Sequence, residues 1–491
     1  MSERIPHFRT LILGAGFGGL GMGAQLVRNG DEDFVILERS SDIGGVWLDN
    51  NYPGAACDTE AHLYCYSFFP HLRVSRMYAG REELLGYMNR LKDAFGLRAH
   101  LRLNREVTEA RWDTENSLWR FEMADGERCT ATFFVPAWGQ LNQPAIPAFE
   151  GLDAYRGKFF HSARWDEGAA LRGKRVASIG NAASAVQYVP EIAPEVAHLT
   201  VFQRSANWIM PRNQQVFTEE QLDAYEADPG TFEASRKQLH DFRERGFRRT
   251  QIGTNDQQEG VSIARQHLAA QVADPQLRAK LTPDYELGCK RILRSDDFYP
   301  ALARPNVTLE TRPIKGFYAQ GIVTADGEEL PFDTVIFGTG FASQAFHGDL
   351  AIHGAAGASL SHSWEEGAAA YLGMAVPDFP NMFLVYGPNT NLNHNSIITM
   401  LEIQQSYIIE ALRAAELKGA ALAVKLPVFR DFNRKLQADM ATSAFSSDCS
   451  SWYKNKAGKV INNWSGTVDQ YRAAVRWKAD DYLWMREGAL R

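Results

Sequence analysis

The chain has 491 residues, too many for one compact core, so we expect two or three domains. Hydrophobic residues make up 45% and charged residues 23%, which excludes disorder or a coiled coil over the whole chain. Lys and Arg total 52 against 59 Asp and Glu, a net charge of −7, and this balance argues against a nucleic-acid partner. No stretch approaches the roughly 20 apolar residues that span a bilayer, so we expect a cytoplasmic protein without membrane insertion.

The cysteines are scattered, form no CxxC motif and are not accompanied by a histidine cluster at ligand spacing. There are five of them, at Cys57, Cys65, Cys129, Cys289 and Cys449. We therefore expect neither a disulfide framework nor a metal site. Unpaired cysteines fit a reducing compartment best.

The first forty residues predict a strand–turn–helix–strand unit with a GxGxxG motif at its turn. In chain order its parts are an apolar run at 10–13, Gly14, Gly16, Gly19, a helix over 20–27 and a second apolar run at 34–37. The glycines allow a tight turn, close approach of a pyrophosphate and close packing of the helix, whose N-terminus attracts phosphate. Glu38, at the end of the second strand, would accept hydrogen bonds from ribose hydroxyls and repel a 2′-phosphate. The site therefore suits FAD or NAD and not NADP.

A similar unit returns later, with a strand at 175–179, a turn at Gly180, a helix over 182–192 and a strand at 199–202. Alanines replace the second and third glycines of the motif. Arg204 stands where the first unit has its acid, and an arginine there can hold a 2′-phosphate by bidentate contacts.

This second unit predicts NADP(H) binding, with Gly180, Ser184, Arg204 and Ser205 in the site. The alternative is a degenerate nucleotide fold that carries only a surface arginine.

Further along the chain, residues 140–151 contain prolines and predict a linker between the two units. Residues 218 to about 285 are charged and helix-prone. Their basic side chains would either cover a solvated helical insertion or form a basic lip for an anionic cofactor; they include Arg236, Lys237, Arg243, Arg245, Arg248 and Arg249. A strand at 334–337, followed by Gly338-Thr339-Gly340, is expected to return the chain to the first domain.

The fold class is therefore α/β, with two Rossmann-like dinucleotide-binding domains, for FAD and NADP, and a helical insertion. We expect the first part of the FAD-binding domain at 1–145 and the NADP-binding domain at 146–215 and 286–328. The helical insertion takes 216–285. Residues 329–491 would return to the FAD-binding domain and supply a C-terminal active-site loop.

Two long motifs carry a family resemblance. Residues 44–58, GGVWLDNNYPGAACD, fit the pattern [AG]GxWxxxx[FY]P[GM]xxxD at every fixed position. Residues 155–166, YRGKFFHSARWD, fit FxGxxxHxxxW followed by Pro or Asp, with Tyr155 in place of Phe. In these motifs the chain resembles the flavin-dependent Baeyer–Villiger monooxygenases (class B flavoprotein monooxygenases), and the likeness runs through Phe341 and more loosely to Trp464. Trp165 favours this family, because related N- and S-oxygenating enzymes usually carry Phe or Tyr there.

The resemblance implies an enzyme that uses FAD, NADPH and O₂ to insert oxygen beside the carbonyl of a small-molecule ketone. The product would be an ester or lactone, formed through a C4a-peroxyflavin. Arg291 would lie over the flavin, where its fixed charge favours the peroxide as an anion. Asp58 would pair with Arg291 and position it. Read without the family, Asp58 could cap a helix and Arg291 could be a cofactor-phosphate contact.

Other positions take roles from the same resemblance. Lys290 would hold the NADP 2′-phosphate together with Arg204 and Ser205. Trp452, in a loop resembling the family's SWY…GK segment, would reach the nicotinamide nucleotide and help close the site. Trp47 would be a packed wall of the flavin site, and His161 a linker histidine that acts in domain movement.

Three other activities stay open on the sequence. One is an N- or S-oxygenating flavin monooxygenase on the same scaffold. Another is a flavin disulfide reductase, which needs a cysteine pair beside the flavin, usually CxxxxC, whereas Cys57 and Cys65 are eight apart. The third is an NADPH oxidase or flavin-dependent sensor without an organic substrate, favoured by the departure at Ala182.

Overall fold

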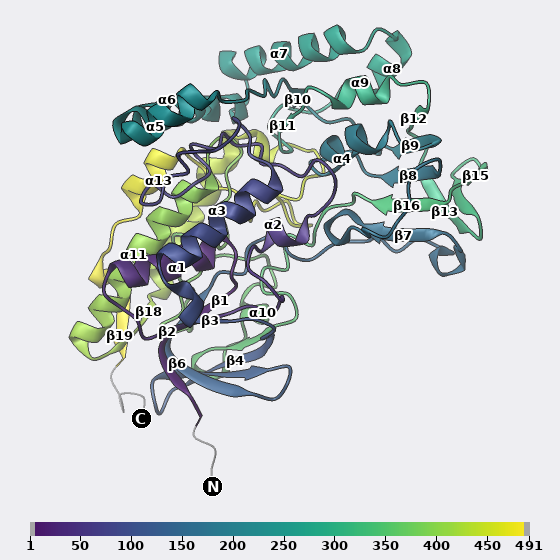
Figure 1. Ribbon diagram of the computed structural model, residues 1–491. Coiled ribbons are helices and arrows are strands. Elements are labelled where there is room, and N and C mark those ends of the chain that lie inside the picture. Colours follow the sequence, from purple (N-terminus) through teal and green to yellow (C-terminus); the bar gives the residue numbers. More distant parts are fainter. Residues whose placement is uncertain (1–4, 486–491) are drawn as a thin grey trace.

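A seven-stranded sheet forms the base of the first domain in the computed structural model, which describes residues 5–485 (Figure 1). Its spatial order is β17-β4-β5-β6-β1-β2-β3. The strands are β1 (His7–Leu13), β2 (Phe34–Leu37), β3 (Leu101–Arg102), β4 (Val107–Asp113), β5 (Leu118–Met123), β6 (Arg128–Pro136) and β17 (Ala351–His353). β1 is parallel to β2 and β6, whereas β4, β5 and β6 form an antiparallel meander. All four residues of β2 are buried, as expected for a strand covered on both faces.

Helices from both ends of the sequence cover this sheet. α11 (Ile397–Lys418) lies beside α1 (Phe17–Arg28), and Gln405 Nε2 donates a 3.2 Å hydrogen bond to the carbonyl of Gly18 (Figure 1). Other elements of this domain are α2 (Val46–Asp49), α3 (Arg81–Ala94), α10 (Leu360–Ser363), α12 (Leu426–Asp439), α13 (Val468–Ala474), β18 (Ala421–Val424) and β19 (Tyr482–Met485). Within residues 5–485, no helix has the length and apolar character needed to cross a membrane.

The second domain is built on a parallel sheet of order β12-β9-β8-β16-β7. Its strands and helices are β7 (Lys158–His161), β8 (Arg175–Ile179), α4 (Ala185–Ile192), β9 (His198–Phe202), α9 (Phe298–Leu302), β12 (Val307–Glu310) and β16 (Thr334–Phe337), with a hairpin sheet of β13 (Ile314–Tyr318), β14 (Gly321–Thr324) and β15 (Glu329–Pro331). β16 pairs in parallel with both β7 and β8. The expected return to the first domain at residue 329 is therefore too early. β16 completes the second sheet because its backbone pairs with β7 on one side and β8 on the other, and all four of its side chains are buried on the faces of that sheet.

The predicted insertion is helical, and its helices lie along one edge of the molecule (Figure 1). They are α5 (Glu219–Ala227), α6 (Pro229–Gly246), α7 (Asn255–Gln271) and α8 (Pro275–Lys280), with the short parallel pair β10 (Ile209–Met210) and β11 (Leu293–Arg294) at the two ends of the insertion. Two of its basic residues fit neither expectation, because they are largely shielded from solvent and do not form a lip for an anionic cofactor. Arg236 donates to the carbonyls of His62 and Cys65, at 2.7 and 2.9 Å, and Arg243 is buried against Glu60.

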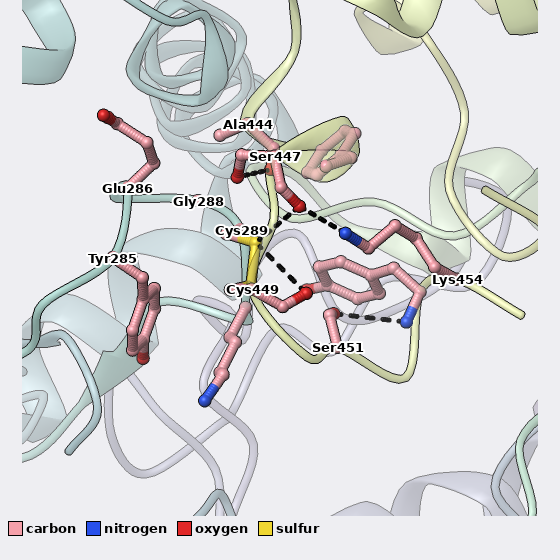
Figure 2. The surroundings of a disulfide bond; sticks show 12 residues. Tyr285, Glu286, Gly288, Cys289, Ala444, Ser447, Cys449, Ser451 and Lys454 are labelled. Atoms are coloured by element: carbon pink, nitrogen blue, oxygen red, sulfur yellow. Dashed lines mark hydrogen bonds between the residues drawn. A yellow bond between two sulfur atoms is a disulfide. The ribbon is translucent and has the colours of Figure 1, made fainter. Parts of the chain in front are cut away.

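The expectation that no cysteines pair is wrong at one position. Cys289 and Cys449 form a disulfide across 160 residues of sequence, with their Cα atoms 6.3 Å apart (Figure 2). Cys57, Cys65 and Cys129 are buried and free. The pair escaped the sequence analysis because no spacing rule connects residues that only the tertiary fold brings together.

Candidate active site

A cavity of about 1140 Å³ lies between the two domains and is lined by both glycine turns. It exceeds the roughly 300–1,000 Å³ of an ordinary single-ligand site, so it has room for two ligands. The predicted site residues on its wall are Gly14, Gly16, Glu38, Trp47, Asp58, Gly180, Ser184, Arg204, Ser205, Lys290, Arg291 and Trp452. Of the predicted site residues only Gly19 lies behind the wall, where it serves packing.

The first glycine turn has the geometry of a dinucleotide cradle. Gly14 has φ +107°, and a Cβ there would lie 2.8 Å from the carbonyl oxygen of Ala137. A Cβ at Gly19 would lie 1.8 Å from the carbonyl oxygen of Gly14, so α1 packs closely only with glycine. Gly16 caps α1 without a side-chain hydrogen bond, which leaves the helix N–H groups facing the cavity for a pyrophosphate. These features fit a dinucleotide.

Glu38 is held at the end of β2 by two backbone amides. Ala15 N–H donates to Oε2 at 2.7 Å and Ser40 N–H donates to Oε1 at 2.9 Å. A carboxylate has about four acceptor sites, so ribose hydroxyls can still bind. The acid is fixed and buried at the cavity wall, as the ribose role requires.

The second turn repeats the first. Gly180 has φ +108°, and a Cβ there would lie 2.3 Å from the carbonyl oxygen of Gly338. The following helix begins at Ala185 and not at the predicted Ala182, because residues 182–184 first form a separate turn on the cavity. The sequence analysis missed the role of Asn181, whose amide donates to Gln203 Oε1 at 2.8 Å and to the carbonyl of Ser205 at 3.0 Å. Asn181 thus fixes the end of β9 beside the turn.

Two cations share the corner next to this second turn. Lys290 Nζ donates to Ser205 Oγ at 2.7 Å and lies 4.4 Å from the ring centroid of Tyr285. Burial and the nearby charge of Arg204 lower the pKa of Lys290. Neither cation forms an ion pair with a carboxylate in the part of the chain that the structure describes. Two neighbouring cations without an anionic partner fit a phosphate group.

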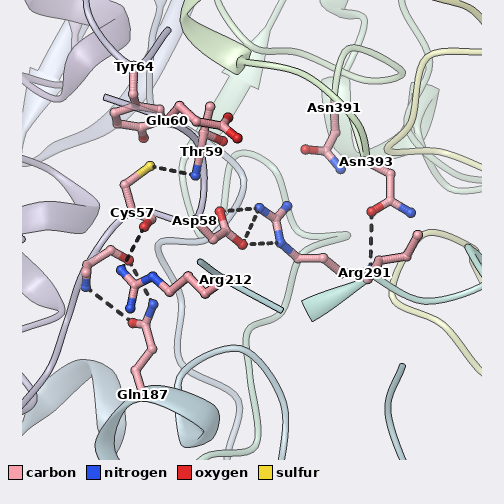
Figure 3. Close-up of polar contacts among 12 residues, drawn as sticks. Cys57, Asp58, Thr59, Glu60, Tyr64, Gln187, Arg212, Arg291, Asn391 and Asn393 are labelled. Carbon is pink, nitrogen blue, oxygen red and sulfur yellow. Dashed lines mark hydrogen bonds and ion pairs between the residues drawn. The ribbon is translucent and has the colours of Figure 1, made fainter. Parts of the chain in front are cut away.

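Asp58 and Arg291 form a bidentate ion pair on the cavity wall (Figure 3). Arg291 Nε donates to Asp58 Oδ2 at 3.0 Å, and Nη2 donates to Oδ1 and Oδ2 at 2.7 and 2.8 Å. The two side chains are 32% and 26% exposed. Nη1 of Arg291 has no hydrogen-bond partner among residues 5–485, so one edge of the guanidinium is free for a ligand in the cavity.

The surroundings of this pair carry excess positive charge. Arg243 Nε donates to Glu60 Oε2 at 2.7 Å, and Arg294 lines the cavity nearby. Three arginines therefore face two carboxylates, which leaves one net positive charge. Burial by itself would raise the pKa of Asp58, but the charges of Arg291, Arg243 and Arg294 outweigh it and hold that pKa below its ordinary value. Neither Glu60 nor Arg294 was a predicted site residue, because isolated charged residues carry no motif.

Of the aromatic and histidine residues singled out from the sequence, two line the cavity and two are packed away from it. Trp47 and Trp452 line the cavity, and the indole N–H of Trp47 donates to Tyr64 Oη at 3.2 Å. Trp165 packs on Phe160, with ring centroids 5.1 Å apart, away from the cavity wall. His161 is buried at the end of β7 and bonds through Nε2 to the carbonyl of Gly340 at 2.9 Å, at the link between the domains.

The cysteines do not provide a flavin dithiol. Cys57 lines the cavity, but burial and then the charge of Asp58 raise the pKa of its thiol to about 12, and it is unpaired. Cys65 is buried and free as well. Cys289 and Cys449 are paired but are not among the residues that line the cavity. This arrangement disfavours a disulfide reductase.

His240, Glu244 and Asp469 form a cluster with the residue types of a metal site. Glu244 is already engaged: Oε1 accepts the N–H of Val468 at 3.1 Å and Oε2 accepts that of Asp469 at 3.0 Å. These contacts satisfy the N-terminus of α13, so the cluster has a structural explanation without a cation.

The comparisons with known proteins agree with this geometry. Residues 8–219 match the family described as flavin-binding monooxygenase-like. A Baeyer–Villiger monooxygenase of Streptomyces coelicolor is 40% identical over 473 residues, covering 96% of this chain and 91% of that protein. The crystal structure of cyclohexanone monooxygenase from Rhodococcus sp. Phi1 bound to NADP⁺ superposes with a TM-score of 0.88 at 28% identity, covering 98% of this chain and all of that one. OTEMO in complex with FAD and NADP gives a TM-score of 0.89 at 25% identity, with the same coverage.

Proposed function

The chain belongs to the flavin-dependent Baeyer–Villiger monooxygenases, and from this premise we propose that Arg291 is its catalytic cation and Asp58 the residue that positions it. The enzyme uses FAD, NADPH and O₂ to insert one oxygen atom beside the carbonyl of a ketone, giving an ester or lactone. The substrate is a small molecule. What remains to be tested is which side chains carry each part of this reaction.

Bound FAD, once reduced by NADPH, supplies the activation of O₂. Arg291 carries a charge that it cannot lose near neutral pH, and Asp58 aims it while leaving Nη1 free toward the cavity. It therefore stabilises negative charge that develops at the reacting centre without donating a proton. Burial of the wall around it strengthens this interaction, because less water screens the charge.

The other assignments concern cofactor binding. Gly14, Gly16 and Glu38 would hold FAD against the first turn. Arg204, Ser205 and Lys290 would bind the 2′-phosphate of NADPH, a role supported by two cations that form no ion pair with a carboxylate of the described residues. Gly180 and Ser184 would face its pyrophosphate at the start of α4. Trp47 and Trp452 would form apolar walls that limit the access of water.

The domain assignment follows the two sheets. Residues 5–145 and the chain after Phe337 would form the FAD-binding domain, and 146–215 with 286–337 the NADP-binding domain. We also propose a cytoplasmic location, supported by three buried, unpaired cysteines. Fractionation of cells that express the protein would check the location.

The bidentate Asp58–Arg291 pair on the cavity wall carries the catalytic assignment, and an Arg291→Ala variant tests it. We expect the variant to keep FAD and to be reduced by NADPH, yet to release hydrogen peroxide in place of ester when supplied with a ketone. Arg291→Lys keeps the positive charge but loses the guanidinium that donates two hydrogen bonds to Asp58, and it serves as the matched variant. Normal ester yield from Arg291→Ala would refute the assignment.

An N- or S-oxygenating activity can be separated in the same assay. Product analysis on a ketone and a thioether, with equal concentrations of each, should give ester as the main product. Sulfoxide as a minor product is compatible with the proposed site, because both substrates would be oxidised in the same cavity.

A further inference from the structure

The Cys289–Cys449 disulfide joins two segments that form adjoining parts of the cavity wall (Figure 2). Cys289 directly precedes Lys290 and Arg291, and Cys449 directly precedes the 450–452 segment. All of these neighbours line the cavity, whereas the two sulfurs stand behind it. The bond therefore ties the part of the wall that carries Lys290 and Arg291 to the part that carries Trp452.

The two segments meet even without the covalent bond. A Cβ at Gly288 would lie 3.3 Å from Ala444 Cβ and 3.2 Å from Thr250 Cα, so the chains pack in direct contact. The amide of Ile252 donates to the carbonyl of Thr442 at 3.0 Å. The 250–252 segment thus packs against both Gly288 and residues 442–444, and these contacts would keep the two cysteines near each other in the reduced protein as well.

In the reduced protein the Cys289 thiol would have a hydrogen-bond acceptor within reach. Cys289 Sγ lies 3.6 Å from the carbonyl oxygen of Ser447, within reach of a weak S–H hydrogen bond. Cys289 is fully buried, whereas Cys449 is partly exposed. A small oxidant therefore reaches Cys449 first, and Cys289 is poised to resolve the oxidised sulfur.

The segment that follows Cys449 is held by individual hydrogen bonds and by one large buried side chain. Between η7 (Ala444–Ser446) and α13 the described chain has no helix or strand. Tyr453 anchors the segment by burial, and Gln344 Nε2 donates to the carbonyl of Lys454 at 2.5 Å. Ser343 Oγ, on the cavity wall, also donates to the carbonyl of Trp452 at 3.4 Å, and the disulfide is the covalent link between residues 450–452 and the adjoining wall at Lys290 and Arg291.

We propose that Cys289 and Cys449 form a peroxide-oxidisable dithiol, and that its disulfide locks the 450–452 segment over the cavity and slows the release of the nicotinamide nucleotide. The oxidant is hydrogen peroxide, which flavin enzymes release when O₂ is reduced without oxygen transfer to a substrate. Disulfides in reducing compartments are usually redox-sensing, which fits a bond at this position. The enzyme would thus respond to its own unproductive turnover.

The chemistry balances without further reactants. The Cys449 thiolate attacks one oxygen of the peroxide, the O–O bond breaks, and one water leaves as a sulfenic acid forms. The sulfur of Cys289 attacks the sulfenic sulfur, the S–O bond breaks as the S–S bond forms, and the departing oxygen takes the Cys289 thiol proton and leaves as a second water. Two electrons and two protons pass from the thiols to the peroxide. A dithiol reductant reverses the change by exchange.

Thiol counting on the full-length holoenzyme tests the site. Under denaturing conditions we expect five free thiols in protein prepared with reductant, and three after one equivalent of hydrogen peroxide, with mapping of the Cys289–Cys449 peptide. Cys449→Ser should hold four thiols before and after peroxide. Cys129→Ser, at a buried cysteine of β6, is the matched control and should fall from four to two.

The lock is tested by the rate at which NADP⁺ dissociates, followed by the absorbance change of the bound flavin after displacement. We expect about tenfold slower dissociation from the disulfide form than from the reduced form, a modest fraction of what a cross-link usually contributes. Cys449→Ser should show the fast rate with or without peroxide.

The oxidisable pair is refuted if peroxide leaves five thiols or if another pair forms, and the lock is refuted if oxidised and reduced protein release NADP⁺ at equal rates. The rate measurement rests on the proposed roles of Lys290 and Trp452, whereas the thiol count does not. A correct thiol count with unchanged release would therefore remove the lock and leave the oxidisable pair in place. Reduced wild-type protein supplies the open reference even if the serine variant folds poorly.

Discussion

Two carboxylates on one short segment of the chain, Asp58 and Glu60, each pair with an arginine, and their surroundings give the two pairs different tasks. Asp58 binds Arg291 with 26% and 32% of the side chains exposed, on the wall of the cavity. Glu60 binds Arg243 with only 5% and 9% exposed, between the first domain and α6. Both pairs join residues far apart in sequence, and both have hydrogen-bond geometry within the normal range.

The two pairs differ in whether the arginine presents a hydrogen-bond donor to the cavity. Arg291 keeps one nitrogen free toward a large cavity, so its charge is available to a ligand. Arg243 also donates to the carbonyl of Asp58 at 3.2 Å, and Glu60 also accepts from Tyr78 Oη at 3.1 Å. The buried pair therefore supports the backbone of the residue that the exposed pair uses. An arginine–carboxylate pair is therefore structural where it is buried, as in Glu60–Arg243, and available to a ligand where it is partly exposed, as in Asp58–Arg291.

The largest effect on stability should follow from removing one partner of the buried Glu60–Arg243 pair. Glu60→Ala leaves the charge of Arg243 buried without a partner, so we expect the free energy of unfolding to fall by about 3–5 kcal/mol. Thermal unfolding with the bound flavin as a probe measures the loss. A Glu60→Met, Arg243→Met double variant removes both charges and should recover most of the stability. If the single variant is as stable as wild type, the pair is not the support that its burial indicates.

Asp58→Asn should reduce activity with a smaller change in stability. Arg291 is partly solvated, so its charge tolerates the loss of a partner, but its guanidinium is no longer aimed. We expect kcat for ester formation to fall about 100-fold, the cost of a misplaced catalytic group, with KM for the ketone little changed. Asp58→Glu keeps the charge and should recover part of the rate. Equal losses in both variants would mean that the charge alone is insufficient and that carboxylate position decides.

Arg204→Gln tests a cation that has no carboxylate partner within residues 5–485. The charged contact to a 2′-phosphate should be lost, so we expect KM for NADPH to rise about tenfold while KM for NADH stays near its wild-type value. Steady-state kinetics with both nucleotides measure the ratio. Arg245→Gln, on the exterior of α6, is the control. A parallel rise for NADPH and NADH would place Arg204 away from the 2′-phosphate.

Glu244 shows how a third carboxylate, on the same helix as Arg243, responds to pH. Burial opposes its charge, but hydrogen bonds from His394, the Asp469 amide and Asn395 outweigh burial and lower its pKa to about 2. Because the folded-state pKa is depressed, its contribution is complete above the unfolded pKa and is lost as pH falls through the folded value. The melting-temperature difference between wild type and Glu244→Gln should therefore be largest near pH 7 and shrink below about pH 4. A difference that is constant with pH would show that the charge of Glu244 contributes nothing.

Local sequence was sufficient for the two nucleotide-binding units. The turn at Gly14, the position of Glu38 after β2 and that of Arg204 after β9 all follow from strand–turn–helix patterns of fewer than about 40 residues. Such patterns depend on neighbouring residues and backbone sterics, so they are readable without tertiary contacts. The pairing of Asp58 with Arg291 was available only through a family resemblance, since the two are separated by 233 residues.

Other features were decided by the tertiary structure alone. β16 looked like a return to the first domain, but its partners β7 and β8 could be identified only once the sheet was assembled. Arg243 looked like one more charge on a solvated helix until α6 was seen to pack on Glu60. Cys289 and Cys449 looked unpaired for the same reason. The sequence specifies the periodicity and chemistry of each segment, whereas long-range pairing depends on which buried surfaces meet, and that is settled only when the whole core packs.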